Sequence, residues 1–288
     1  MDFLSNLSSA VVTGVLLGGL YALIALGLSM VFGVMKLINV AHGDLVVFGS
    51  YFGYAMMTYL GVDPLLSLVA GMPIMFGLGY AIQRLLLNKS FKVSMESPLI
   101  IAFGISIILE NAYQITFSPL SKGLTAPYAM AVVTIGDLRL PLVYFIDFVA
   151  AVVVMILMRE FLRRTYLGLA IRAASQERRA ALLMGISPER VYAYTFAIAM
   201  ASAAIAGICL GMTFPFVPAS GLTYLIIAFG VIVLGGMGNI LGTLVGGIVF
   251  GLAQTVGGQF IGVTEQLMVA YLLVMLVLTI RPQGIFSR

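Results

Sequence analysis

The sequence predicts an all-α, polytopic integral membrane protein, and its composition, length and pattern of apolar runs carry that prediction. Of the 288 residues, 61% are hydrophobic and only 9% are charged, whereas an average soluble domain has roughly 45–50% apolar residues. A membrane-spanning helix needs about 20 apolar residues, so this length holds about eight to nine transmembrane or re-entrant helices joined by short links. No room remains for a separate soluble domain, and we expect residues 1–288 to form a single unit.

Nine apolar runs follow one another along the chain. They span residues 8–33, 45–60, 64–87, 98–118, 142–158, 191–212, 221–236, 240–258 and 265–280. Asp63-Pro64 and Ser97-Pro98 each fit a helix N-cap followed by a first helical proline. In the link 119–141, the stretch VVTIGDLRL indicates a small hairpin around Gly136-Asp137.

Two features leave the membrane topology partly open. The glycine-rich residues 213–262 allow short or re-entrant helices as readily as full crossings. GLYALIALG at 19–27 and GLTYLIIAFG at 221–230 form a faint echo, which either an internal repeat or the biased composition explains.

Basic residues set the expected orientation. The net charge of +4 comes from side chains that lie between apolar runs, mostly on one side of them, which is typical of membrane orientation rather than nucleic-acid binding. One group lies between residues 159 and 190: Arg159, Arg163, Arg164, Arg172, Arg178, Arg179 and Arg190. Positive short loops face the cytoplasm, so we expect the 84–97 link and the C-terminus inside, and the 119–141 link and the N-terminus outside. The start MDFLSNLSS lacks the basic region of a cleaved signal peptide, so the first run is expected to be retained.

The longest polar interruption is residues 169–190, LAIRAASQERRAALLMGISPER. If its first part is one continuous helix, one face carries Arg172, Ser175, Gln176 and Arg179, and another carries Ala173, Glu177, Ala180, Ala181 and Met184. Alanines permit a close approach by a partner, and a carboxylate among them offers an arginine a bonding position. Gly185 fits a helix C′ position, and Ser187-Pro188 fits the cap and first residue of the next helix. We therefore expect a helix, a glycine turn and a helix re-entering the membrane, serving either as a docking element or only as a solvated charged loop.

Polar residues inside the apolar runs are candidates for a translocation path, because such groups are costly in lipid. Glu110, Asn111 and Gln114 either line a path or form a hydrogen-bonded structural group between helices. Asn39, His42 and Asp44 precede a short run, where they either meet a polar ligand or lock a bend. Asn239, in the stretch GGMGN, is expected to cap a glycine-rich turn.

Several chemistries are excluded by missing motifs. The chain has no G-x-x-x-x-G-K-S/T stretch, so it is not expected to bind ATP itself. One histidine and one cysteine, Cys209, cannot assemble a zinc site or an intrachain disulfide. Without a G-x-S-x-G elbow, a hydrolase using His42 has little support. We expect no catalytic residue, no metal site and no bound cofactor, and the lack of an intramembrane string of charges argues against an ion-coupled carrier.

Four blocks carry a resemblance to a known family. LINVAHGDLVVFGSYFGY, RAASQERRAALLMGISPERVYAYTFAIAMASAAIAG, VIVLGGMGNILGTLVGGIVFG and RPQGIF together resemble the LivH-type permease subunit of branched-chain amino acid ABC transporters. The resemblance implies a permease domain spanning 1–288 in a bacterial inner membrane. Its implied partners are a second permease (LivM-like or an identical copy), two cytoplasmic ATPase subunits that bind the ATP and Mg, a periplasmic solute-binding protein and lipid, without nucleic acid.

The resemblance also implies that residues 165–190 are the counterpart of the EAA coupling loop. The ATPase-coupling residues would be Arg172, Gln176, Glu177, Arg178, Ala181, Gly185 and Ile186. The links 119–141, 213–220 and 259–264 would meet the binding protein. Relatives also carry urea, short amides or aromatic carboxylates, so the cargo stays open, and the alternative of another class is a stand-alone channel or secondary transporter.

Overall fold

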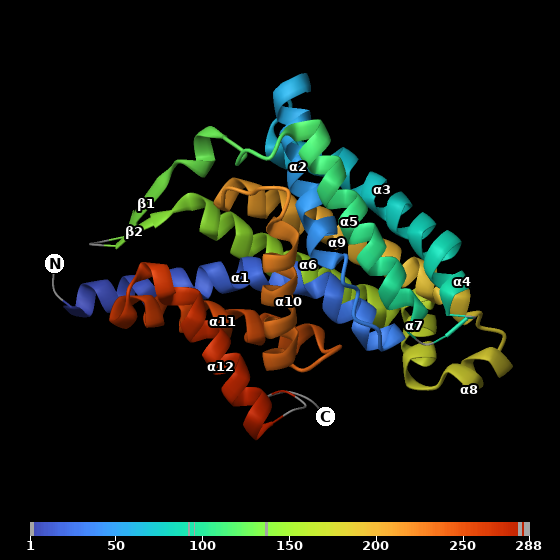
Figure 1. Cartoon of the computed structure of the whole chain (residues 1–288). Helices are drawn as coiled ribbons and strands as arrows, with labels where there is room; N and C mark the ends of the chain where they lie inside the picture. The colour runs from blue at the N-terminus through green and yellow to red at the C-terminus, as the bar shows by residue number, and fades with distance from the viewer. Residues whose placement is uncertain (1–2, 92, 95, 136–137, 282–283, 285–288) are drawn as a thin grey trace.

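The computed structural model describes residues 3–91, 93–94, 96–135, 138–281 and 284, and it confirms a mostly helical, polytopic membrane protein. Its helices are α1 (Phe3–Met35), α2 (His42–Leu60), α3 (Pro64–Ile82), α4 (Asn88–Ser90), α5 (Ser97–Phe117), α6 (Leu142–Arg164), α7 (Tyr166–Gln176), α8 (Arg178–Leu183), α9 (Pro188–Thr213), α10 (Ser220–Gly235), α11 (Ile240–Ile261) and α12 (Gln266–Ile280). A π-helical turn (Gln83–Leu87) joins α3 to α4, and single 3₁₀ turns lie at Pro127–Ala129 and Val263–Glu265. Helix α1 runs through the bundle in Figure 1 and packs on α6, α9, α10 and α11, whereas α3 packs on α9 and α5 on α2.

All nine predicted apolar runs are helical. Six described helices are long and apolar enough to cross a membrane, namely Asn6–Met35, Pro64–Ser90, Ser97–Phe117, Leu142–Arg164, Pro188–Thr213 and Ile240–Ile261. Of the two helices in the glycine-rich region, α11 has 22 residues and α10 has only 16. At 1.5 Å per residue, α10 is shorter than a hydrocarbon core of about 30 Å. The region therefore contains one short helix and one of full length.

Of the two predicted aspartate- or serine-proline caps, the one at α3 is present and the one at α5 is displaced. Asp63 caps α3 by accepting a hydrogen bond from the Leu65 amide, and Pro64 is the first helical residue. At α5 the expected cap is displaced by one position, because Ser97 is already helical and Glu96 is the N-cap. Helix α6 extends to Arg164 rather than residue 158, so Arg159, Arg163 and Arg164 are helical.

Helices α1 and α9 form the interior and are mostly buried, whereas α5 lies at the edge and is mostly exposed. The packing has a two-fold pattern in which α1, α2 and α3 correspond to α9, α10 and α11. Helix α1 packs on α11 as α9 packs on α3, and α1 packs on α10 as α9 packs on α2. Helices α2 and α10 also pack on each other. This pattern relates α1–α3 to α9–α11, whereas the sequence echo would pair α1 with α10. The echo therefore does not identify the structural repeat.

Glycines allow the tightest helix crossings. Gly43, in the first turn of α2, lies against Gly221 in the first turn of α10, and a Cβ on either residue would overlap the other helix. The α1–α11 crossing is similar, because a Cβ on Gly18 would lie 2.7 Å from the Gly247 oxygen. Small residues at such crossings allow close backbone packing, which is a main source of helix association in lipid.

The hairpin expected in the 119–141 link is present. Strands β1 (Val132–Ile135) and β2 (Leu138–Pro141) pair antiparallel, with Thr134 opposite Arg139; Gly136 and Asp137 lie outside the described residues. In Figure 1 the hairpin lies at one end of the bundle, and α7 and α8 lie at the other.

Two contacts join the 119–141 link to other segments at the end of the bundle where the hairpin lies. Lys122 and Phe216 exchange two backbone hydrogen bonds of 2.9 Å, which hold the link against residues 214–219. The Tyr128 hydroxyl donates to Asp63 Oδ1 at 2.7 Å, and burial, with the neighbouring Asp63 carboxylate, raises the pKa of Tyr128 to about 12.

Candidate coupling element and translocation path

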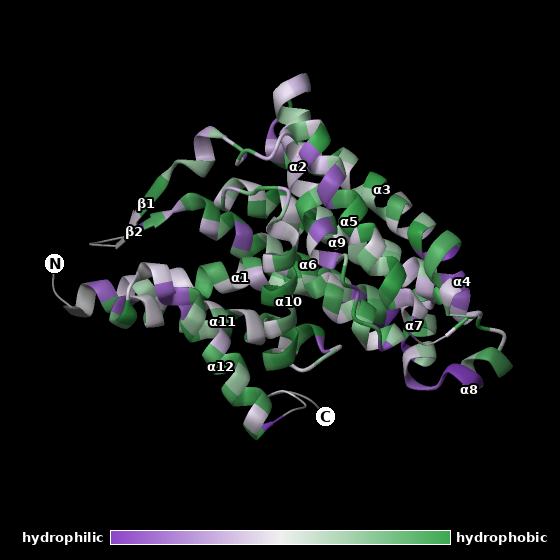
Figure 2. Cartoon of the chain, in the orientation of Figure 1, coloured by the Kyte–Doolittle hydropathy of each residue, from purple (hydrophilic) through white to green (hydrophobic). Residues whose placement is uncertain are grey.

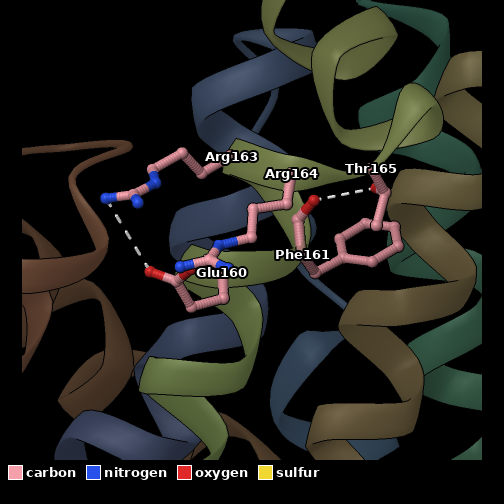
Figure 3. Close-up of polar contacts among 5 residues, drawn as sticks. All are labelled: Glu160, Phe161, Arg163, Arg164 and Thr165. Atoms are coloured by element: carbon pink, nitrogen blue, oxygen red, sulfur yellow. Dashed lines mark hydrogen bonds and ion pairs between the residues drawn. The ribbon is translucent and has the colours of Figure 1, made fainter.

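The candidate coupling element begins where α6 ends. Thr165 caps α7: its hydroxyl accepts from the Gly168 amide at 3.0 Å and donates to the Phe161 carbonyl at 2.8 Å. Figure 3 shows this junction, with Arg163 and Arg164 beside Glu160 on the last turns of α6. Exposed ion pairs of this kind contribute at most about 1 kcal/mol. The position of α7 therefore depends mainly on its buried stripe of Ala170, Ile171 and Ala174.

The predicted continuous helix through residues 169–184 is wrong, because the chain breaks at Glu177. Glu177 is extended (φ −148°, ψ 100°), and its carboxylate accepts a hydrogen bond from the Arg179 amide at 3.2 Å. It therefore ends α7 and caps α8. Arg179 consequently does not share a continuous helical face with Arg172 and Gln176, and Glu177 does not lie on an alanine face.

The turn after α8 has the predicted form. Gly185 has φ of +80°, the left-handed region that favours glycine. The Ile186 amide donates to the Ala181 carbonyl and the Gly185 amide to the Leu182 carbonyl, both at 3.0 Å, which completes a Schellman-type helix end. Ser187 then occupies the N-cap position of α9 and Pro188 its first helical position, although the Ser187 side chain makes no capping bond.

The predicted coupling residues differ in exposure. Arg172, Gln176, Glu177, Arg178 and Gly185 are exposed, Ile186 is half-buried and Ala181 is buried. The Ala181 methyl group therefore packs within the chain. The sequence-based set contains neither Leu182 nor Leu183, and it named Met184 only as part of the alanine face. These three residues at the end of α8 are 52%, 89% and 81% exposed, and we call them the coupling tip. An exposed apolar tip bordered by arginines is typical of a docking surface. Its sequence signal was the apolar triplet directly before Gly185.

One candidate path residue, Asp44, lies where α2 packs on α5. Asp44 is buried in the first turn of α2, and its Oδ2 accepts a hydrogen bond of 2.5 Å from the Ser106 hydroxyl on α5. The Tyr113 hydroxyl, also on α5, donates to the Asp44 carbonyl at 3.0 Å. These two bonds join the start of α2 to the edge helix α5.

Helix α5 carries a polar stripe, which we define as Ser106, Glu110, Asn111 and Gln114. Ser106, Glu110 and Gln114 follow at intervals of four residues and share one face. Gln114 Nε2 lies 3.4 Å from Glu110 Oε1, and Asn111 Nδ2 donates to its own helix at Ile107. Asn111 and Gln114 are exposed and Glu110 is half-buried. Figure 2 shows hydrophilic segments on α5 among largely hydrophobic helices.

Asn39 and His42 lie in the interior, at the bend between α1 and α2. His42 is fully buried, and its Nε2 lies 2.8 Å from the Ile24 carbonyl in the middle of α1. Asn39 Oδ1 accepts from the Ala41 amide at 3.2 Å. Helix α2 begins at His42, so His42 and Asp44 belong to its first turn rather than to the preceding link. This geometry gives both Asn39 and His42 a local bonding role at the bend.

Asn239 lies at the turn between α10 and α11, where Gly238 meets Gly33 of α1. Its side chain accepts from the Gly242 amide at 3.1 Å and so caps the start of α11. The structure therefore brings Asp44 and Glu110 to the α2–α5 contact and places Asn239 at a separate turn.

Sequence reasoning missed one buried carboxylate. Asp147 on α6 is fully buried, and its Oδ2 accepts a 2.5 Å hydrogen bond from the Thr213 hydroxyl at the end of α9. The signal was present in the sequence, because Asp147 is the one charged residue in the run 142–158. Among the described residues, no group of three or more His, Cys, Asp or Glu side chains could hold a metal ion.

The bundle of apolar helices, the polar edge helix α5 and the exposed basic pair α7–α8 are together the features expected of a membrane transport subunit. Comparison with known proteins agrees. Residues 10–280 match the family described as branched-chain amino acid transport system, permease component, and the chain belongs to this family. It is therefore a multi-pass membrane permease, the transport component of an ABC transporter complex.

Individual relatives cover nearly the whole chain. It is 34% identical over 290 residues to the high-affinity branched-chain amino acid transport system permease protein BraD of Pseudomonas aeruginosa, covering 96% of this chain and 94% of BraD. It is 32% identical over 298 residues to the permease protein LivH of Escherichia coli K12, with the same coverage. A probable LivH of Methanocaldococcus jannaschii is 27% identical over 250 residues, covering 84% of this chain and 78% of that protein.

Proposed function

We propose that this chain forms the translocation path of a binding-protein-dependent ABC importer for branched-chain amino acids or similar small polar solutes in a bacterial inner membrane. The polar stripe of α5 carries the proposal. Helix α5 is the least buried of the six candidate spans, yet it presents an amide pair and a carboxylate at its surface. Such groups are costly against acyl chains, so this face of α5 is expected to line a path shared with a second permease subunit.

The chemistry of the stripe supports a cargo with an ammonium group. Glu110 is half-buried at the surface of α5, and Asp44 lies behind Ser106. Carboxylates form charge-assisted hydrogen bonds with an ammonium group, and they repel an anionic carboxylate cargo. Of the alternative cargoes, aromatic carboxylates therefore fit the stripe least, whereas urea and short amides could use the amides of Asn111 and Gln114.

The coupling tip and its arginine border support docking of ATPase subunits. The tip projects from the end of the bundle opposite the hairpin (Figure 1), and the density of arginine around it favours the cytoplasmic side. We propose that the tip inserts into an ATPase subunit that supplies ATP and Mg, while the link joined by Lys122 and Phe216 receives a periplasmic binding protein. The chain would bind no cofactor itself.

Uptake by proteoliposomes containing the complete complex tests the role of the stripe. Glu110→Gln should reduce ATP-driven leucine uptake at least tenfold while the complex stays assembled in gel filtration. Glu96→Gln is the matched control, because Glu96 is an exposed carboxylate at the N-cap of the same helix, and it should transport normally. If Glu110→Gln instead dissociates the complex, Glu110 is a structural group between helices.

Two further measurements separate the alternatives. Competition of leucine uptake by urea, acetamide and benzoate identifies the cargo class, and competition only by branched-chain amino acids supports the proposal. Liposomes containing this chain alone should be silent; transport there, without ATPase or binding protein, would show a stand-alone channel or secondary transporter.

A further inference from the structure

A basic cavity lies at the coupling-tip end of α3, away from the polar stripe. It has a volume of about 440 Å³ and lies between the end of α3 and the first turns of α9. Tyr80, Arg84, Asn88, Lys89, Glu189 and Arg190 contribute to its walls. Three cationic side chains therefore surround it with one carboxylate, so the cavity favours an anionic occupant.

The cavity walls are held in place by polar contacts. The Arg84 guanidinium donates to the Tyr80 hydroxyl at 2.7 Å and lies over the Tyr80 ring. A buried relay joins the two walls: Gln83 donates to Asn88 Oδ1, and Asn88 Nδ2 donates to the Glu189 carbonyl, both at 3.0 Å. Within the described part of the chain, neither Lys89 nor Arg190 forms an ion pair. Their charges are thus available to a ligand in a preformed cavity.

An apolar groove adjoins the cavity on the side of α5. It has a volume of about 540 Å³, shares Lys89 with the cavity, and is lined otherwise mainly by Leu85, Leu86, Val93, Ile100 and Ile101. Leu85 and Ile100 are 58% and 71% exposed. The π-helical turn Gln83–Leu87 contributes Arg84 to the cavity and both Leu85 and Leu86 to the groove, and π-helical turns are frequent at functional sites.

We propose that the cavity and the groove together bind one anionic phospholipid, with its phosphate between Arg84, Lys89 and Arg190 and an acyl chain along the groove. The depth agrees with this occupant. The Pro64–Ser90 span has 27 residues, so Arg84 and Lys89 lie at its last turns, where basic side chains reach the headgroup region. Basic pockets between membrane helices on the cytoplasmic side are suited to anionic headgroups, and the shared Lys89 explains why a lipid fits better than a free anion.

A lipid in this position would act on the coupling element. Glu189 and Arg190 lie in the first turn of α9, four and five residues after the Gly185 turn. The bound phosphate would therefore fix the start of α9 against α3 and reduce the freedom of the coupling tip.

Native mass spectrometry of the purified complex tests the site directly. Complexes are exchanged into mixed micelles of phosphatidylglycerol and phosphatidylcholine, and retained lipids are counted. We expect preferential retention of phosphatidylglycerol. Retention should fall about fivefold for Arg84→Gln and about 30-fold for Arg84→Gln combined with Lys89→Gln. These are the losses of affinity expected for removing one and two basic side chains at an anionic membrane surface. The control combines Arg159→Gln with Arg163→Gln, which removes the same charge from exposed positions at the end of α6 and should retain the lipid.

Several outcomes would overturn the proposal. The first is equal retention of both lipids, and the second is equal loss in the control. The third is displacement of the retained phosphatidylglycerol by glycerol phosphate at concentrations that leave the mixed micelles intact, which would show a site for a free anion. Loss of the ATPase subunits from the double variant with unchanged lipid retention would show that the cavity is part of the ATPase interface. Should the double variant fail to assemble, Arg190→Gln on the opposite wall gives the same readout with the α3 side intact, with about fivefold loss expected.

Discussion

Gly43→Ala tests how tightly the start of α2 is held. A Cβ at this position would overlap the Gly221 carbonyl oxygen and lie 2.8 Å from the Gly221 carbonyl carbon and the Leu225 amide nitrogen. All three neighbours are backbone atoms of α10, so no rotamer change can relieve the overlap. Overpacking of this kind costs about 1–3 kcal/mol, and it would push the adjacent Asp44 away from Ser106.

Gly77→Ala is the matched control for this substitution. Gly77 lies within α3, and a Cβ there would meet nothing within 4 Å. Alanine is favoured over glycine in a helix by about 0.5–1 kcal/mol, so this variant should be neutral or slightly more stable. The two variants should therefore differ by roughly 1.5–4 kcal/mol, which is more than tenfold in the ratio of folded to unfolded protein.

The only cysteine provides the assay. The chain has no tryptophan, but Cys209 is 1% exposed, so a thiol-reactive fluorogenic dye reports the unfolding of the purified chain during heating in detergent. Gly43→Ala should melt at a lower temperature than wild type, and Gly77→Ala at the same or a higher temperature. Equal midpoints for the two variants would refute the inference that the α2–α10 crossing has no space for a methyl group.

Three further substitutions probe other contacts. Glu177→Arg should lower co-purification of the ATPase subunits at least tenfold without changing membrane insertion, because it removes the α8 cap and reverses the charge; normal uptake would contradict the coupling role. Asp147→Leu should destabilise the chain by about 1–3 kcal/mol by leaving the Thr213 hydroxyl without its acceptor, whereas Asp147→Asn should cost less than half as much in the same melting assay. His42→Ala should lower the melting midpoint through the lost contact with Ile24 and the cavity it leaves, and a wild-type midpoint would exclude a structural role for His42.

Local signals explain what could be predicted from the sequence. Apolar runs located the membrane helices because a lipid-exposed backbone has to satisfy its own hydrogen bonds within each segment. The aspartate-proline cap of α3 and the glycine turn after α8 were also predicted from the sequence, because they depend on the backbone preferences of single residues.

Contacts between distant segments explain what could not be predicted. The Asp44–Ser106 bond spans 62 positions, and no periodic pattern in either helix specifies its partner. The break at Glu177 was missed because helix propensity favours glutamate in an α-helix, while in the structure its carboxylate bonds to the Arg179 amide outside helical geometry. The coupling tip was missed because an apolar triplet reads equally well as a buried helix face.

Helix α9 connects the candidate coupling element to the candidate path. It runs without interruption from Pro188, directly after the coupling turn, to Thr213, which bonds Asp147 at the hairpin end. Along its length it packs on α2, where the Ser50 hydroxyl donates to the Gly207 carbonyl at 2.5 Å. A rigid, largely buried helix cannot move at one end without moving these neighbours. A displacement imposed at the coupling tip would therefore reach α2, and with it the Asp44–Ser106 contact, through packing alone.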